Sequence, residues 1–302
     1  MRYRLACFDL DGTLLGDDSK LSAYSRDALN RMIKDGLLFS YATARSLNTA
    51  KKVTKGIVAK IPLIVYNGAM VVDNVSGDFL IKNFFQEEIS HVIRDLIQHG
   101  VFPIVYAFLD GVEKFTYIPE KCSPETKAFL DTRKNDSRNH PVGTELELTA
   151  GDIFYITCID SPEKLEPLYH NYADKYHCVF QEDIYTKHQW LEIMPKAASK
   201  ANAIRQLKDY LGCQKVVAFG DGKNDLDMFE MADEAYAVSN AVAELKEIST
   251  GIIGSNNEDG VAQVLEALDI DTNGLLPVPD PKALSRILSS VQGRSMQTRR
   301  SL

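Results

Sequence analysis

Two carboxylates separated by one residue stand at the end of an apolar segment near the start of the chain. Residues 3–9 are typical of a short buried strand, and Asp9 and Asp11 would project together from its end because residues i and i+2 face the same side. Neighbouring carboxylates repel each other, so a cation between them is the natural remedy. Gly12 permits a sharp turn directly afterwards. Alone, this D-x-D-G pattern is better explained as an ordinary strand-to-loop turn, and the later segments decide against that.

A second acidic segment follows another apolar run late in the chain. Residues 216–225 read Val-Val-Ala-Phe-Gly-Asp-Gly-Lys-Asn-Asp, which predicts a strand that ends in a glycine-rich turn. Asn224 and Asp225 would then open a helix. Asp221 is expected at the same sheet edge as Asp9, where a second metal-binding carboxylate is needed. An acidic surface turn is a poor explanation after so apolar a strand.

Two further positions have groups suited to a phosphate. Thr43 lies at the end of a predicted strand. Its hydroxyl and nearby backbone N–H groups, such as that of Ala44, could hold a phosphate oxygen. The simpler explanation for Thr43 is a β-branched residue that closes a strand. Lys200 falls in the first turn of a helix that Ser199 would cap. A lysine there is unfavourable beside the positive end of the helix dipole, which makes sense if Lys200 reaches inward to a carboxylate or phosphate. The alternative is a solvated surface lysine.

Strands and helices alternate at both ends of the chain. The first part predicts strands at 3–9, 37–42 and 61–66, helices at 22–34 and 47–60, and an Asn67-Gly68 turn before residues 70–72. The last part predicts strands at 190–194, 215–219, 235–238 and 252–253, and helices from 199, near 226–231 and at 260–267. This alternation implies right-handed crossovers and an α/β fold with a mainly parallel, doubly wound sheet.

The middle of the chain has a different pattern, which predicts a separate α+β module. Its expected helices are 89–99 and 162–176, and its expected strands are 102–108, 115–118, 153–160 and 178–181, with a polar stretch at 134–143. We therefore expect a discontinuous core over 1–83 and 190–270, an inserted domain over 84–189 and a C-terminal tail over 271–302. An insert of this kind usually lies near the carboxyl edge of the sheet, where open α/β folds bind ligands.

Composition excludes several classes of protein. The 302 residues are 45% hydrophobic and 25% charged, the balance of a soluble globular chain. The net charge of −8 and a pI near 5.3 argue against broad binding to nucleic acid or acidic membranes. The five scattered cysteines predict neither a zinc site nor a disulfide framework. No apolar run approaches the roughly 20 residues that span a bilayer, and a cytoplasmic protein is expected. The oligomeric state stays open.

The four chemical segments together resemble the motifs of the haloacid dehalogenase (HAD) superfamily: FDLDGTLL at 8–15, ATAR at 42–45, Lys200, and GDGKND at 220–225. The insert resembles the α/β cap of the Cof-like sugar-phosphatase branch, as do VYNGA at 65–69, LEIMP at 191–195, VSNA at 238–241 and NEDGVA at 257–262. The resemblance covers residues 4 to about 268 and implies a Rossmann-like core with an inserted cap. Ala44 stands where the branch commonly has glycine, and Ala197 and Ala201 replace small flexible residues, but every charged position is filled.

The resemblance implies a phosphoric monoester hydrolase that uses Mg²⁺ and acts on a small phosphorylated metabolite such as a sugar phosphate. Asp9 would attack phosphorus to form an aspartyl-phosphate, with Asp11 as general acid and then general base. Asp9, the backbone carbonyl of Asp11, and Asp221 would hold the ion. The resemblance also implies that Thr43, Ala44 and Lys200 bind the phosphate. Asn224 and Asp225 would support the metal site, directly or through water.

Two other functions remain open. A sugar phosphomutase on the same fold would need a closed cap that excludes water, and would form a stable sugar bisphosphate. A non-catalytic regulator or binding module could also keep the fold, although the intact charged residues speak against it. A P-type ATPase domain would need membrane helices, and a haloalkanoate dehalogenase would not need the metal carboxylates.

Substrate specificity is expected in the cap. The polar candidates are Asp183, Tyr185, Lys187 and His188, each of which is more simply explained as an ordinary surface residue. Sugar phosphates, pyridoxal phosphate and flavin mononucleotide all remain open as substrates.

Overall fold

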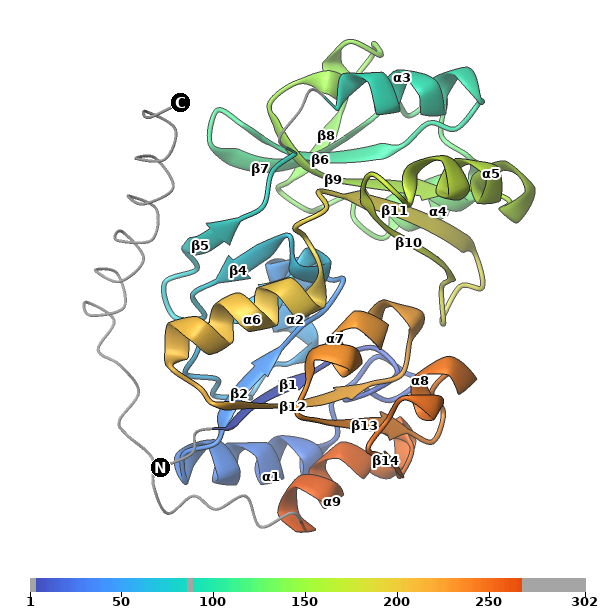
Figure 1. Cartoon of the computed structure of the whole chain (residues 1–302). Coiled ribbons are helices and arrows are strands. Elements are labelled where there is room, and N and C mark those ends of the chain that lie inside the picture. Colours follow the sequence, from blue (N-terminus) through green and yellow to red (C-terminus); the bar gives the residue numbers. More distant parts are fainter. Residues whose placement is uncertain (1–3, 86–88, 268–302) are drawn as a thin grey trace, which may run out of the picture. The chain divides into compact units, whose positions relative to one another are not determined.

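The computed structural model describes residues 4–85 and 89–267, and these form two compact units (Figure 1). The first unit comprises residues 4–65, Met70–Ile81 and 200–267. The second comprises Tyr66–Ala69 and Lys82–Ser199, without residues 86–88. The expected tail over 271–302 lies outside the described residues.

The first unit is built on a five-stranded parallel sheet, which confirms the predicted α/β class. The strand order is β14-β13-β12-β1-β2, where the strands are β1 (Arg4–Phe8), β2 (Leu38–Tyr41), β12 (Lys215–Gly220), β13 (Glu234–Val238) and β14 (Gly251–Ile253). The N-terminal strand β1 lies between β2 and β12. Because all five strands run in parallel, their carboxyl ends meet at one edge.

Aromatic side chains stack across this sheet close to its carboxyl edge. The Phe8 ring lies between those of Phe39 and Phe219, at centroid distances of 4.9 and 5.0 Å. The stack continues from Phe219 to Tyr236 at 5.6 Å. The stack holds β1 and β12 together directly before Asp9 and close to Asp221.

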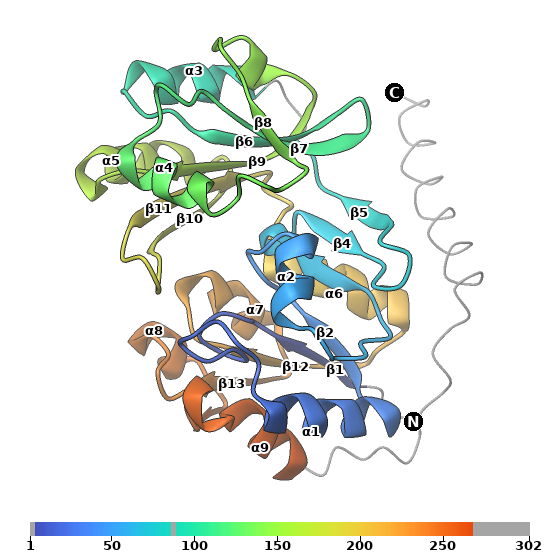
Figure 2. The ribbon, with the colours of Figure 1, turned by 180° about the vertical axis from the view of Figure 1, so that it is seen from behind.

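Helices cover both faces of the parallel sheet, as in a doubly wound fold. They are α1 (Ala23–Lys34), α2 (Leu47–Val53), α6 (Lys200–Leu211), α7 (Leu226–Met231), α8 (Ala243–Glu247) and α9 (Gly260–Ala267). Helices α1 and α9 lie together on one side of the sheet, and α6 and α7 lie together on the other (Figures 1 and 2). Ser22 caps α1 by accepting a hydrogen bond from the Ser25 N–H.

One local prediction for this unit needs correction, and one strand was missed. The helix predicted over 47–60 ends at Val53, because Gly56 takes a positive φ of +99° where the chain packs against Arg26. The turn predicted at Asn67-Gly68 joins β3 (Leu63–Val65) to β4 (Met70–Val72). Strand β4 also pairs with β5 (Phe79–Lys82), whose residues were not predicted as a strand. The residues of β5 show no alternation of buried and exposed positions, so the sequence pattern does not reveal the strand.

The second unit is a separate α+β module, as predicted. Its six strands are β6 (Ile104–Leu109), β7 (Val112–Tyr117), β8 (Asn139–Pro141), β9 (Asp152–Ile159), β10 (His177–Glu182) and β11 (Gln189–Met194). They form a sheet in the order β10-β11-β9-β6-β7-β8, in which only the β7–β8 pairing is parallel. Helices α3 (Ser90–Gln98) and α5 (Pro162–Tyr172) supply Val92, Ile93, Leu96, Leu165 and Leu168 to its core.

The strand predicted over 190–194 was expected in the catalytic core, and this expectation is wrong. That strand is β11, which forms antiparallel hydrogen bonds with β9 and β10 in the second unit. Its Leu191 and Ile193 enter the core of that unit. In the second unit, β8 and helix α4 (Pro124–Asp131) were not predicted, although Ser123 caps α4 and Pro124 begins it, which is a recognisable start signal.

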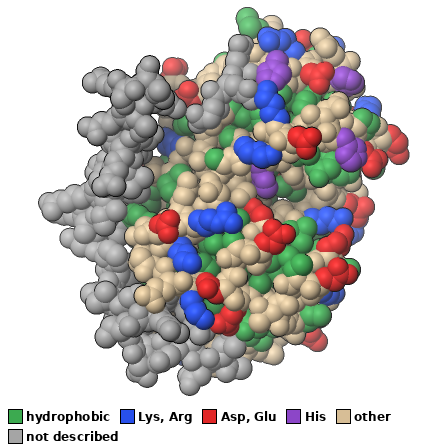
Figure 3. Space-filling view, in the orientation of Figure 1, with side chains coloured by type: hydrophobic (Ala, Val, Ile, Leu, Met, Phe, Trp, Pro, Cys, Tyr) green, Lys and Arg blue, Asp and Glu red, His purple; other side chains and the backbone are tan. Residues whose placement is uncertain are grey.

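The surface carries charges of both signs. On the face shown in Figure 3, acidic and basic side chains are interspersed. Between residues 4 and 267, leaving out 86–88, there is no helix both long and apolar enough to cross a bilayer.

Candidate active site

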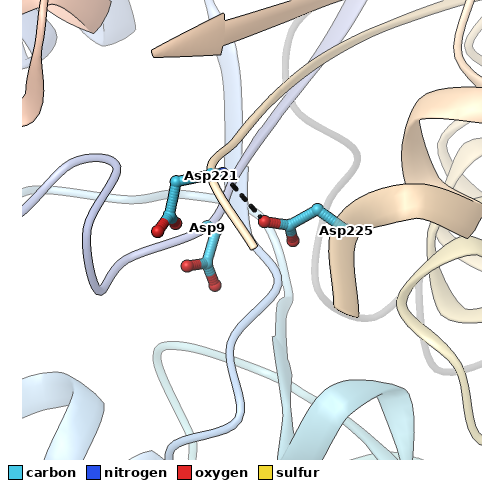
Figure 4. A group of neighbouring side chains, drawn as sticks. All are labelled: Asp9, Asp221 and Asp225. Carbon is cyan, nitrogen blue, oxygen red and sulfur yellow. Dashed lines mark hydrogen bonds between the residues drawn. The ribbon is translucent and has the colours of Figure 1, made fainter. Parts of the chain in front are cut away.

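Three carboxylates converge at the carboxyl edge of the parallel sheet (Figure 4). Asp9 follows β1, Asp221 follows β12, and Asp225 ends the 3-10 turn Lys223–Asp225 that leads into α7. One oxygen of each carboxylate lies within 4.8 Å of those of the other two. The structure therefore brings together Asp9 and Asp221, as the sequence predicted, and adds Asp225 to them. We call these three residues the carboxylate group.

The ammonium group of Lys200 binds two members of the carboxylate group. Its Nζ donates to Asp9 Oδ1 at 2.7 Å and to Asp225 Oδ1 at 2.7 Å. The Lys200 side chain is 1% exposed, so this residue is not a solvated surface lysine. Burial on its own would lower the pKa of Lys200, but Asp225 and Asp9 outweigh burial and raise it. Lys200 therefore stays charged and offsets part of the negative charge beside it.

The remaining negative charge makes this group a candidate cation site. Burial raises the pKa of Asp9 to about 7, with Lys200 opposing the rise and Asp225 and Asp11 adding to it. Burial, followed by the charges of Asp9 and Asp225, raises the pKa of Asp221 well above its usual range. Carboxylate oxygens are the ligands that hard divalent cations prefer. Three carboxylates and one ammonium leave two negative charges when ionised, which one divalent ion would neutralise.

A hydroxyl group orients the Asp221 carboxylate, and backbone N–H groups orient the Asp225 carboxylate. The Thr13 hydroxyl donates to Asp221 Oδ1 at 2.8 Å, and the backbone N–H groups of Asp221 and Gly222 each donate to Asp225 Oδ2 at 3.0 Å. Gly12 has a φ of +77°, and a Cβ there would lie only 2.3 Å from Asp221 Oδ2. The turn after β1 therefore requires glycine on both steric and conformational grounds. The sequence suggested no role for Thr13, which the FDLDGTLL motif nevertheless contains.

The carboxylate of Asp11 has a different partner. Arg45 Nε donates to Asp11 Oδ2 at 2.7 Å and Arg45 Nη2 donates to Asp11 Oδ1 at 2.5 Å. Arg45 Nη2 also donates to the Ser19 hydroxyl at 3.3 Å. The Asp11 side chain thus forms a bidentate ion pair with Arg45 and is not one of the three converging carboxylates. Arg45 was not assigned a role from the sequence, although it ends the ATAR motif.

The predicted phosphate-binding segment lies at the end of β2. The Thr43 N–H donates to the Ile64 carbonyl at 3.1 Å, and Thr43 Oγ1 accepts from the Arg45 N–H at 3.2 Å. Thr43 is buried and Ala44 is half-buried. Asn224 is half-buried in the turn before Asp225. Thr43 and Ala44 therefore follow β2 at the edge where Asp9 follows β1.

The four specificity candidates share one turn between β10 and β11 in the second unit. Asp183 Oδ1 accepts from the Thr186 N–H and the Thr186 hydroxyl, both at 2.7 Å, and from the Tyr185 N–H at 3.2 Å. Lys187 has a φ of +60°, and His188 is half-buried. Asp183 thus organises the turn itself, and none of the four belongs to the carboxylate group.

A family comparison accounts for this arrangement. The model of the haloacid dehalogenase-like hydrolases matches residues 6–265, which include every residue of the site described above. The chain belongs to the haloacid dehalogenase-like hydrolases. The resemblance inferred from the four motifs is thereby confirmed. The predicted fold class, a parallel-sheet core with a separate second sheet region, is confirmed as well.

Individual relatives agree with the family assignment. A Bacillus subtilis protein named 5-amino-6-(5-phospho-D-ribitylamino)uracil phosphatase YwtE is 29% identical over 286 residues, which cover 86% of this chain and 96% of that protein. A crystal structure from Thermotoga maritima is similar with a TM-score of 0.72 at 28% identity, covering 89% and 98% of the two chains. A sugar phosphatase of HAD subclass IIB has a TM-score of 0.70 at 19% identity, covering 88% and 98%, and shows the shared fold alone. The expected class of enzyme, a HAD phosphatase, is confirmed.

Proposed function

We propose that this HAD enzyme is a Mg²⁺-dependent phosphatase that hydrolyses a small phosphorylated metabolite, a sugar phosphate or a similar ester, through a phosphorylated Asp9. The observation that carries the proposal is the meeting of Asp9, Asp221 and Asp225 with the buried ammonium of Lys200 at one sheet edge. A nucleophilic carboxylate beside a cation site is what phosphoryl transfer to an aspartate requires.

We assign the Mg²⁺ ligands to the carboxylates of Asp9 and Asp221 and the backbone carbonyl of Asp11, with Asn224 and Asp225 supporting the ion through water. The residual charge of the carboxylate group and its all-oxygen donors suit this ion. When bound, Mg²⁺ offsets the repulsion between a carboxylate and a phosphate dianion.

In the first step, a carboxylate oxygen of Asp9 attacks phosphorus while the bond from phosphorus to the ester oxygen breaks. Asp11 gives its proton to the departing alkoxide, which leaves as an alcohol. Lys200, the Thr43 hydroxyl and the Ala44 N–H would bind the other phosphoryl oxygens. Lys200 already contacts Asp9 at 2.7 Å, so it can lower the charge repulsion between nucleophile and phosphate.

In the second step, water attacks the phosphorus of the aspartyl-phosphate and the bond from phosphorus to Asp9 breaks. Asp11, now ionised, accepts a proton from the attacking water, and inorganic phosphate is released. Asp9 and Asp11 thereby return to their starting protonation states. Arg45 binds both oxygens of Asp11 in its ionised state, which is the state that accepts the proton from water. The first step requires Asp11 to be protonated, with at most one of its oxygens still bound by Arg45.

We further propose that the first unit is the catalytic core and that the second unit is the cap that selects the leaving group. The relative YwtE is named for a phosphate ester on a ribityl chain, which supports a small polyol or sugar phosphate as the substrate class. A net charge of −8 and interspersed surface charges favour such a metabolite over nucleic acid as the partner. Asp183, Tyr185, Lys187 and His188 stay candidates for contacts with the leaving group.

The test is release of inorganic phosphate from a panel of phosphorylated metabolites with Mg²⁺, comparing the wild-type chain with Asp9→Asn. The panel should include sugar phosphates, pyridoxal phosphate, flavin mononucleotide and the ribityl ester named above. We expect release from at least one compound by the wild type, and a loss of at least about 1,000-fold in Asp9→Asn because the nucleophile is removed. Equal release by the two proteins would exclude Asp9 as the nucleophile, and a sugar bisphosphate in place of free phosphate would indicate a mutase.

A further inference from the structure

Two asparagine side chains bind the backbone of the loop that follows β1. Asn240, two residues after β13, donates from Nδ2 to the Gly12 carbonyl oxygen at 2.7 Å. Asn256, three residues after β14, donates from Nδ2 to the Leu15 carbonyl oxygen at 3.0 Å. The two asparagines are joined to each other, because the Asn256 N–H donates to Asn240 Oδ1 at 3.1 Å. We call Asn240 and Asn256 the asparagine bridge.

The asparagine bridge completes the hydrogen bonding of a tight turn. Within the loop, the N–H groups of Leu14 and Leu15 both donate to the Leu10 carbonyl, at 3.0 and 2.8 Å. These bonds give the N–H groups of the turn their acceptors. The carbonyl groups of Gly12 and Leu15 receive their donors from the two asparagine amides. A primary amide suits this task because it donates at one end and accepts at the other. Asn240 uses both ends.

The loop position held by this bridge bears directly on the site. Gly12 follows Asp11 and packs against the Asp221 carboxylate, and the Thr13 hydroxyl binds that carboxylate at 2.8 Å. The segment that contains Asn240 also holds Asp221, since the Val242 N–H donates to the Asp221 carbonyl at 2.9 Å. A displacement of the Gly12 peptide would therefore move groups on both sides of the proposed metal site.

We infer that Asn240 and Asn256 are positioning residues of the active site, which set the places of Asp11 and Asp221 through the Gly12 and Thr13 backbone. The inference rests on the proposed function, because it assumes that Asp11 and Asp221 act on Mg²⁺ and substrate. Constellations of this kind work only when held within about 0.5 Å of their productive geometry. The asparagine bridge provides that restraint from the segments after β13 and β14; β13 lies beside β12, and β14 lies beside β13.

The neighbouring Asn257 offers a matched control. It also binds this loop, but only at Asp17: its Nδ2 donates to Asp17 Oδ2 at 2.9 Å, and its Oδ1 accepts from the Asp17 N–H at 3.1 Å. Both Asn240 and Asn257 are exposed residues, so replacing either by alanine leaves no buried cavity. Of these two asparagines, only Asn240 binds the carbonyl of Gly12, the residue that follows Asp11.

The experiment compares Asn240→Ala, Asn257→Ala and the wild-type full chain. Calorimetric titration with Mg²⁺ alone gives the dissociation constant, and p-nitrophenyl phosphate hydrolysis gives kcat and KM. We expect Asn240→Ala to raise the Mg²⁺ dissociation constant about 10-fold and to lower kcat by about 10- to 100-fold, as for lost partners of metal ligands. KM should change less than about 2-fold, because the bridge does not bind substrate. Asn257→Ala should stay within about 2-fold of the wild type in all three quantities.

The outcomes separate the bridge from the proposed function. If Asn240→Ala and Asn257→Ala give the same Mg²⁺ dissociation constant and kcat while the wild type is active, the positioning role is wrong. A wild type that neither binds Mg²⁺ nor releases phosphate contradicts the proposed function instead. Unfolding midpoints show whether each variant is folded during the assay. If Asn240→Ala is unfolded, Asn240→Leu, which keeps the size of the side chain but has no donor, takes its place, and a wild-type Mg²⁺ dissociation constant in that variant overturns the inference.

Discussion

Arg45 binds both carboxylate oxygens of Asp11, at 2.7 and 2.5 Å. Arg45 comes from the segment after β2 and Asp11 from the loop after β1, so the pair ties together two neighbouring strand ends. A guanidinium fork restrains the orientation of a carboxylate, which a single ammonium cannot do. The side chain that we propose as acid and base is therefore held by a rigid partner.

The first prediction concerns this fork. Arg45→Lys keeps the positive charge but loses the two-pronged geometry, and we expect kcat to fall by about 10- to 100-fold through misplacement of Asp11. Steady-state phosphate release measures the effect. Arg26→Lys is the control, because Arg26 is a half-exposed residue of the same unit that pairs with its neighbour Asp27. Equal kcat values for the two variants would show that the fork has no catalytic use.

The second prediction concerns the buried charge of Lys200. Lys200→Met leaves Asp9 and Asp225 facing each other without their cation, so we expect the free energy of unfolding in EDTA to fall by about 3 kcal/mol or more. Phosphatase activity should be lost as well. Urea unfolding with and without Mg²⁺ measures the stability.

Lys208→Met is the matched control on the same helix, because Lys208 lies 4.0 Å from Asp233 and is 28% exposed. We expect a change of less than about 1 kcal/mol for this more exposed pair. The explanation given for Lys200 is wrong if the two methionine variants lose the same stability.

The third prediction concerns metal binding and stability. Mg²⁺ at 100 times its dissociation constant should stabilise the folded chain by about 2.7 kcal/mol and raise the midpoint of thermal unfolding. Asp221→Asn should lose most of this increase because one ligand charge is removed. Asp209→Asn, which changes an exposed aspartate on α6, should keep it. A midpoint of the wild type that does not respond to Mg²⁺ or to EDTA would argue against the assigned site.

The fourth prediction separates backbone strain from contact with the site. Gly12 and Gly212 both have a positive φ, +77° and +66°, but a Cβ at Gly12 would meet Asp221 at 2.3 Å and a Cβ at Gly212 would meet nothing within 4 Å. Both Gly12→Ala and Gly212→Ala should lose about 1–2 kcal/mol of stability through the left-handed backbone. Only Gly12→Ala should also lose Mg²⁺ binding, as measured by calorimetry. If Gly12→Ala still binds Mg²⁺ as tightly as the wild type, Asp221 can move away from the new Cβ without a loss of Mg²⁺ affinity.

Parts of the site could be predicted because parallel strands bring their carboxyl ends together. Asp9 and Asp221 each follow an apolar run, so their common edge could be inferred from the two runs alone. The contacts of Arg45 with Asp11 and of Thr13 with Asp221 depend on side chains that meet across the fold, and no local pattern indicates them. The roles proposed for individual residues stay predictions.

The fold shows the same division between local and long-range information. The helix near Ala23–Lys34 and the strand at Lys215–Gly220 have strong periodic patterns and were predicted nearly to their ends. The strand Gln189–Met194 was predicted as a strand but assigned to the wrong sheet. A strand pattern indicates which face is buried and does not name the partner strand.

The place of β1 in its sheet has a consequence for synthesis of the chain. One neighbour of β1, β2, is made almost at once, but the other, β12, begins at Lys215, more than two-thirds of the way along the chain. A nascent chain on the ribosome therefore carries Asp9 long before Asp221 and Asp225 exist. Truncated products that end before Lys215 would leave one edge of β1 unpaired and would lack Asp221 and Asp225. Such products would be inert as enzymes.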